Sequence, residues 1–141
     1  MEKFTLYMSI IKKHINGFMT EAFKPYNITG AEAPFIREIA VRKNCRQADL
    51  SKILACDKAH THRIVTKLID KQLIQFASPK GQYLELTEKG KAMVESIDKT
   101  IKAGGSMITA GLTQEEIDMV LNILKKCAEN ASKLKMEVNN D

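Results

Sequence analysis

Apolar side chains recur every three or four residues through the first part of the chain. This spacing predicts one long amphipathic helix over residues 4–23, which Pro25 and Asn27 end. The next residues, Thr29-Gly30-Ala31-Glu32, have the sequence of a capping box, so a second helix is expected from there to Lys43-Asn44. The apolar stripe of the first helix consists of Tyr7, Ile10, Ile11, Phe18, Met19, Ala22 and Phe23, and that of the second consists of Phe35, Ile36, Ile39 and Ala40.

A pair of shorter helices is expected next. The third covers residues 46–54, with Leu50, Ile53 and Leu54 as its buried stripe, and the fourth runs to about residue 71. Asp57 is suited to cap the fourth helix because its carboxylate can accept a backbone N–H of the first turn. The turn between the two helices is Ala55-Cys56-Asp57, and this length is the spacing of a helix-turn-helix.

The period of the pattern then changes from helical to alternating. Ile74 and Phe76 alternate with polar residues, as do Leu84 and Leu86. Between these two pairs, Ser78-Pro79-Lys80-Gly81 has the residue types of a type I turn. Residues 74–86 are therefore predicted to form a small β-hairpin, and a hairpin that directly follows a helix-turn-helix is a wing.

Two further helices are expected after the hairpin. Thr87 caps the fifth, which turns Ala92, Met93 and Ile97 inward, and Gly104-Gly105 predicts a kink or a break in it. A second capping box at residues 113–116 opens the sixth helix. The apolar stripe of the sixth helix consists of Ile117, Val120, Leu121, Leu124, Ala128, Ala131 and Leu134.

The expected architecture is mainly α with a small β-hairpin wing. A length of 141 residues is usual for one domain, so we predict a single domain over residues 1–141. Within it, residues 28–90 form the winged helix-turn-helix module, and residues 1–27 and 91–141 supply the flanking dimerisation helices. The first, fifth and sixth helices are expected to pack against one another and a second copy of the chain, the alternative being an intramolecular bundle.

Positive charge is concentrated in the middle of the chain. The net charge is +5, but residues 42–91 hold eleven basic and five acidic side chains, so this segment carries +6 and the remainder −1. Such a distribution is typical of a module that binds a polyanion, and a solvated basic surface is the alternative.

The predicted fourth helix has two distinct faces when its residues are placed at about 100° each. Thr61, Ile64, Val65 and Leu68 share the core face. On the opposite face the guanidinium of Arg63 is suited to make two hydrogen bonds to guanine in the major groove. His60, His62 and Thr66 are candidates for bases or phosphates, and the more peripheral cations for phosphates, the alternative being a solvated helix face. The candidate DNA-binding residues are Arg46, Lys58, Ala59, His60, His62, Arg63, Thr66 and Lys67.

These residues resemble the multiple-antibiotic-resistance regulator (MarR) family. The resemblance covers nearly the whole chain and is carried by Ile28-Thr29, by residues 50–74 with their aspartate-opened helix, by Leu86-Thr87-Glu88-Lys89-Gly90 and by residues 112–116. It implies a homodimer that places two winged modules on double-stranded DNA. It also implies a repressor that binds a palindromic operator and is released by a small aromatic or other ligand. Ala59, His60, His62 and Arg63 match the family's base-reading stretch.

The chain departs from the family pattern at two places. The family wing usually carries Asp-x-Arg, with the arginine in the minor groove, whereas this tip is Ser78-Pro79-Lys80-Gly81. Lys80 is accordingly expected to act as a phosphate contact. Ala59-His60 stand where small hydroxyl residues are common, so no operator sequence is transferred from a relative. A winged-helix protein-interaction module without specific DNA binding is the alternative function.

The resemblance also implies a ligand cleft beside the dimer helices. His14 lies next to the apolar stripe of the first helix, and with Tyr7, Phe18 and Tyr26 it is a candidate for the lining of that cleft. A packed or solvated histidine is the alternative. Cys56 precedes a helix N-terminus, which favours a thiolate, but a small hydrophobic role explains it equally well.

Several other classes of function find little support in the sequence. His60 and His62 are two apart on a helix and point about 200° away from each other, so no metal site is expected. No grouping of nucleophile, base and acid and no Gly-rich phosphate loop is present, so neither an enzyme nor a cofactor is expected. The odd number of cysteines and the absence of a signal-like or membrane-spanning stretch predict a cytoplasmic protein.

Overall fold

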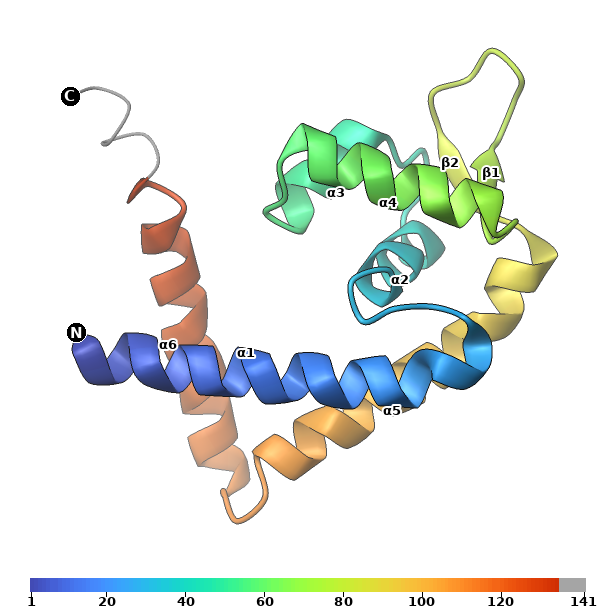
Figure 1. Ribbon diagram of the computed structural model, residues 1–141. Helices are drawn as coiled ribbons and strands as arrows, with labels where there is room; N and C mark the ends of the chain where they lie inside the picture. Colours follow the sequence, from blue (N-terminus) through green and yellow to red (C-terminus); the bar gives the residue numbers. More distant parts are fainter. Residues whose placement is uncertain (135–141) are drawn as a thin grey trace. The chain divides into compact units, whose positions relative to one another are not determined.

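The computed structural model describes residues 1–134 (Figure 1). These residues belong to two compact units, the first covering residues 1–104 and the second beginning at Gly105. Residues 135–141 of the predicted C-terminal dimerisation segment lie outside the described residues. In chain order the elements are α1 (Glu2–Phe23), the 3-10 turn η1 (Lys24–Tyr26), α2 (Ala33–Val41), α3 (Gln47–Ile53), α4 (Lys58–Asp70), β1 (Ile74–Phe76), β2 (Leu84–Leu86), α5 (Glu88–Ile108) and α6 (Gln114–Ala131).

The predicted order of helices and hairpin is confirmed, and so are the predicted caps of α4 and α6. Asp57 accepts the backbone N–H of His60 at 2.7 Å and caps α4. Thr113 and Glu116 exchange the two hydrogen bonds of a capping box at the start of α6. Thr29 and Glu32 exchange the same pair of bonds, but the predicted helix start is wrong, because residues 30–32 form a turn and α2 begins at Ala33. Local side chain to backbone hydrogen bonds therefore determine where α4 and α6 begin.

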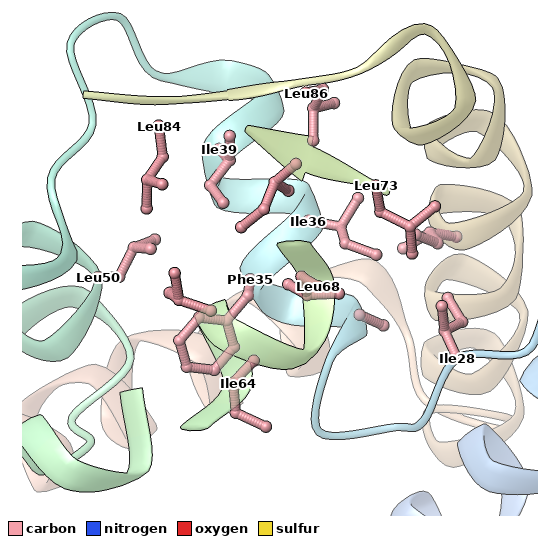
Figure 2. Close-up of a cluster of buried hydrophobic side chains, with 14 of the residues drawn as sticks. Ile28, Phe35, Ile36, Ile39, Leu50, Ile64, Leu68, Leu73, Leu84 and Leu86 are labelled. Carbon is pink, nitrogen blue, oxygen red and sulfur yellow. The ribbon is translucent and has the colours of Figure 1, made fainter. Parts of the chain in front are cut away.

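The first unit is built around one apolar core, part of which Figure 2 shows. Phe35, Ile36 and Ile39 of α2 lie at its centre, between α3 and α4 on one side and the hairpin on the other. The face of α4 predicted to be buried is confirmed, since all four of its residues are at most 5% exposed: Thr61, Ile64, Val65 and Leu68. The opposite face of α4 is thereby directed to solvent.

The wing is a two-stranded antiparallel hairpin with one additional bridge. Ile74 pairs with Leu86 and Phe76 with Leu84. The Gly81 N–H donates to the carbonyl of Ser78 at 3.0 Å, which closes the predicted turn. In addition, the Leu84 N–H donates to the carbonyl of Cys45 at 2.7 Å, so a residue two positions before α3 joins the edge of the hairpin. This contact attaches the wing to the helix-turn-helix.

The junction between the wing and α5 depends on a glycine. Thr87 caps α5 by accepting the Gly90 N–H at 3.1 Å, and its own hydroxyl donates to the carbonyl of Gln72 at 2.6 Å. The Thr87 N–H donates to the carbonyl of Leu73 at 3.1 Å. A Cβ atom at position 90 would overlap that same carbonyl group, so Gly90 permits the close approach of α5 to the strand that follows α4.

The predicted break at Gly104-Gly105 is wrong, because α5 continues through both residues to Ile108. A glycine costs about 1 kcal/mol relative to alanine in a helix interior, which is too little to end a helix flanked by good helix formers. Gly104 has a packing role instead, since a Cβ there would lie 3.1 Å from Cε1 of Phe18 on α1. The glycine lets the Phe18 ring approach the backbone of α5.

Four residues expected in the core are exposed instead. Ile53 is the last residue of the short helix α3, so no following turn covers it. Phe76 ends β1 next to the hairpin loop, where the sheet has no further strand over it. Ala40 and Ala92 lie at the margins of the buried stripes of α2 and α5, and these margins face solvent.

Two helices carry apolar side chains that are exposed among the described residues. On α1, the residues near its C-terminal end are buried, whereas Phe4, Tyr7 and Ile10 are between 44% and 57% exposed. On α6, in the second unit, Val120, Leu121 and Leu124 of the predicted stripe are also exposed. Both stripes exist as predicted, but the described residues bury only part of the first.

Candidate nucleic-acid interface

The outward face of α4 carries the residues proposed to contact DNA. Ala59, His62, Arg63 and Thr66 are exposed, as are Lys58 and Lys67 beside them. His60 differs from the others because it is half-buried, with its ring edge-on to Phe35 at a centroid distance of 6.4 Å. Nδ1 of His60 lies 3.5 Å from Nη2 of Arg63. His60 thus contacts both the core and the guanidinium on the surface.

Side-chain contacts join this face of α4 to α3 and to the wing. Nδ1 of His62 lies 3.3 Å from Oε1 of Gln47, the first residue of α3. Next to Gln47, Arg46 donates from Nη2 to the hydroxyl of Tyr83 at 3.1 Å, and Tyr83 directly precedes β2. Arg46, Gln47 and His62 therefore connect the outward face of α4 to the base of the wing as one polar surface.

The basic residues of the first unit fall into two groups, those that form an ion pair with a carboxylate and those that do not. Several cations of the basic segment are neutralised: Lys71 by Glu32 at 2.8 Å, Arg42 by Glu38 at 2.9 Å and Lys91 by Glu88 at 3.1 Å. In the described part of the chain, none of the basic residues proposed to contact DNA has a carboxylate within 4.0 Å: Arg46, Lys58, Arg63, Lys67 and Lys80. Uncompensated charge thus remains on the surface that carries the candidate residues.

The Asp57 carboxylate is the acid closest to this surface in sequence, and it is engaged in capping. The hydrogen bond from the His60 N–H, together with the nearby charge of Arg63, holds the pKa of Asp57 below its ordinary value. The carboxylate lies at the N-terminal end of α4, where it accepts a hydrogen bond from a backbone N–H and interacts favourably with the helix dipole. Asp57 therefore does not occupy the hydrogen-bond donors of the side chains on the outward face of α4.

Lys80 lies in the turn at the tip of the hairpin and is exposed. Lys80 lies between Pro79 and Gly81, and the tip sequence Ser78-Pro79-Lys80-Gly81 contains no acidic residue. Lys80 is the sole basic residue of the hairpin from Ile74 to Leu86. Its part in DNA binding stays a prediction, as do the parts of the α4 residues.

Two interactions near the candidate surface were missed by sequence reasoning. One is the contact of Arg46 with Tyr83, which are 37 residues apart. The other is the pairing of Lys71 with the buried carboxylate of Glu32 across 39 residues. The pattern of Thr29 and Glu32 indicated a capping role for Glu32, but the long-range partner had no signal in the local sequence.

Solved structures resemble this fold over almost its full length, although no family model matches the sequence. A MarR transcriptional regulator from Methanosarcina mazei Go1 superposes with a TM-score of 0.84 at 23% identity, over 95% of this chain and 99% of that chain. A protein from Listeria monocytogenes, assigned to the MarR family and complexed with a 26mer DNA, has a TM-score of 0.87 at 23% identity, over 97% and 94%. A MarR/EmrR family transcriptional regulator from Acinetobacter sp. ADP1 has a TM-score of 0.83 at 20% identity, over 94% and 96%.

This chain has the MarR-family fold. The predicted architecture of a winged helix-turn-helix with long terminal helices is thereby confirmed. Within the MarR-family fold, the helix-turn-helix pair is α3 and α4, and the wing is the hairpin of β1 and β2 (Figure 1).

The candidate ligand residues of this chain are distributed along α1 and η1. Tyr7, His14 and Tyr26 are exposed, and Phe18 is half-buried against the core. A helix rises about 1.5 Å per residue, so Tyr7 and Phe18 lie about 16 Å apart along the axis and do not share one small cleft by themselves. The ligand cleft stays a prediction.

A separate groove on the first unit is lined by other residues. It has a volume of about 900 Å³ and lies between the end of α2, the outer side of the hairpin and the start of α5. Most of its charged side chains are already engaged, since Glu85 accepts from Gln75 and Glu88 pairs with Lys91.

Among residues 1–134, His, Cys, Asp and Glu form no group of three or more that could hold a metal ion. No helix in the same range is long and apolar enough to cross a membrane.

Proposed function

We propose that this protein is a sequence-specific DNA-binding transcription regulator. It reads the major groove with the outward face of α4 and contacts the backbone with α3 and the wing. The observation that carries the proposal is the composition of that face, on which Arg63, His62 and Thr66 supply hydrogen-bonding groups and the neighbouring cations have no acidic partner in the described residues. The similar fold from Listeria monocytogenes in complex with a 26mer DNA supports the same conclusion.

The working form is a homodimer. The exposed apolar residues of α1 and α6 require cover, because transferring apolar area out of water contributes roughly 25 cal/mol per Å². A second copy of the chain supplies a self-complementary partner for both stripes. Two winged modules related by a twofold axis match a palindromic operator, with the two recognition helices in successive major grooves.

The regulator acts as a repressor that is released by a small ligand. A dimer on an operator blocks access of other proteins to the same DNA. A ligand that binds better to the DNA-free arrangement of the two modules shifts the equilibrium toward release. Tyr7, His14, Phe18 and Tyr26 are the residues of α1 and η1 that we assign to the ligand site, which is completed by other parts of the dimer.

A mobility-shift titration tests the proposal. The probes are the DNA fragment directly upstream of the protein's own coding sequence and a shuffled duplex of the same length and composition. Wild type is expected to prefer the upstream fragment. Arg63→Ala is expected to lose much of this preference, because one bidentate contact to guanine contributes about 1–3 kcal/mol of discrimination.

Arg37→Ala is the matched control. It removes the same charge, but Arg37 is paired with Asp98 of α5 at 3.1 Å and is not on the face of α4. Equal binding of both probes by wild type, Arg63→Ala and Arg37→Ala would contradict sequence-specific reading by α4. That result would favour the alternative of a winged-helix module that serves protein assembly.

A further inference from the structure

The side chains of Arg46 and Tyr83 are held together by two contacts. Nη2 of Arg46 donates to the Tyr83 hydroxyl at 3.1 Å. The guanidinium carbon also lies 5.0 Å from the centroid of the Tyr83 ring, within the range of a cation–π interaction. The ring therefore orients the plane of the guanidinium while the hydroxyl fixes one of its nitrogens.

The backbone on both sides of this pair is fixed as well. The Arg46 N–H donates to the carboxylate of Asp49 at 2.9 Å. The carbonyl of Tyr83 accepts from Ala77 at 2.9 Å, and the next residue, Leu84, bonds to Cys45, which directly precedes Arg46. The two side chains thus extend from a part of the backbone that is held by hydrogen bonds and joins α3 to the wing.

The positive charge of Arg46 remains available. In the described residues no carboxylate lies within 4.0 Å of the guanidinium, although Asp49 is only three residues away. A guanidinium has five N–H donors, and the tyrosine hydroxyl accepts from one nitrogen. The hydrogen bond to Tyr83 also raises the pKa of Arg46.

We propose that Arg46 and Tyr83 form a preformed clamp for one phosphate of the DNA backbone, with Arg46 as the phosphate contact and Tyr83 as its positioning residue. The inference rests on the proposed function, because it names a backbone contact of the same DNA-binding surface. An arginine side chain usually loses rotamer freedom when it binds. Here the contacts with Tyr83 already restrict the rotamers of Arg46 before DNA binds, so less conformational entropy is lost on binding.

The test measures the affinity for a labelled duplex as a function of salt. The probes are the upstream fragment and its shuffled counterpart, since a phosphate contact is made to both. The variants are Arg46→Ala, Tyr83→Phe and the double variant. Arg42→Ala is the matched control, because it removes one arginine four positions earlier whose charge Glu38 already neutralises at 2.9 Å. Circular dichroism melts establish that each variant is folded.

Arg46→Ala is expected to weaken binding about tenfold on both duplexes, as for the loss of a charge-assisted hydrogen bond. It is also expected to reduce the slope of log K against log salt by about 0.9 for each protomer, the value for one phosphate contact. Tyr83→Phe keeps the ring and the charge, so the slope is expected to stay unchanged while affinity falls about threefold. In the Arg46→Ala background, Tyr83→Phe is expected to have no further effect. Arg42→Ala is expected to keep the wild-type slope.

Two results would overturn the clamp while leaving the proposed function in place. One is that wild type binds DNA but Arg46→Ala has the same slope of log K against log salt as wild type. The other is a loss on Tyr83→Phe that is as large in the Arg46→Ala background as in wild type, because Tyr83 would then act without Arg46. Wild-type protein that binds neither duplex in a salt-dependent way would instead contradict the proposed function itself, and the clamp with it.

Discussion

The pair of Glu32 and Lys71 offers a sharp test of how this fold is held together. The Glu32 side chain is 2% exposed, and its two oxygens accept from Nζ of Lys71 at 3.0 and 2.8 Å. The same ammonium donates to the carbonyl of Asn27 at 2.8 Å. Lys71 lies at the C-terminal end of α4, so this one group connects the recognition helix to the loop after α1 and to the start of α2.

Replacing Lys71 by methionine keeps the aliphatic length and removes the charge. Glu32 would then be a buried carboxylate with the Thr29 N–H, at 3.1 Å, as its remaining partner. Removing one partner of a buried ion pair costs about 3–5 kcal/mol. We expect the lower end, about 3 kcal/mol, because the Lys71 side chain is 25% exposed and water can enter in its place. This is a large part of the roughly 5–15 kcal/mol that stabilises an ordinary domain.

Urea unfolding at a fixed protein concentration measures the effect, since the stability of the proposed dimer depends on concentration. Lys71→Met should lower the midpoint without changing the slope. Lys99→Met is the control, because its pair with Glu95 is 74% and 78% exposed and is expected to contribute nothing measurable. The double variant Glu32→Met, Lys71→Met should be more stable than Lys71→Met, since it leaves no unpaired buried charge. Equal midpoints for Lys71→Met and Lys99→Met would refute the reasoning.

Three further outcomes follow from local geometry. Gly90→Ala should destabilise the fold by about 2–3 kcal/mol in the same urea assay, because the new Cβ overlaps the carbonyl of Leu73; an unchanged midpoint would contradict the predicted overlap. Gly105→Ala should stabilise by about 0.5–1 kcal/mol, since a Cβ meets nothing within 4 Å there, whereas Gly104→Ala should gain less. The lowered pKa of Asp57 means that its stabilisation is present above about pH 4 and lost as the pH falls through the folded-state value. Thermal melts at pH 7 and pH 3 should therefore show a larger loss for wild type than for Asp57→Asn, and equal losses would exclude this contribution.

The order of elements, the caps of α4 and α6 and the buried face of α4 followed from the sequence because each depends on neighbouring residues. A cap requires one side chain and a backbone N–H three residues on, as Asp57 and His60 show. The core face of α4 requires a repeat of three or four residues, which Thr61, Ile64, Val65 and Leu68 keep. The same periodicity placed Arg63 on the outer face. Such features are determined by spacing along the chain alone.

The remaining features depend on which distant segments meet, and spacing along the chain carries no information about that. Arg46 approaches Tyr83, and Lys71 approaches Glu32, because the core brings α3 to the wing and α4 to the start of α2. The glycines show the same limit. A glycine in a helix predicts a break by its local cost, but at Gly104 the helix continues and the missing Cβ makes room for Phe18. Local preferences amount to about 1 kcal/mol per residue, and packing over a whole core exceeds them.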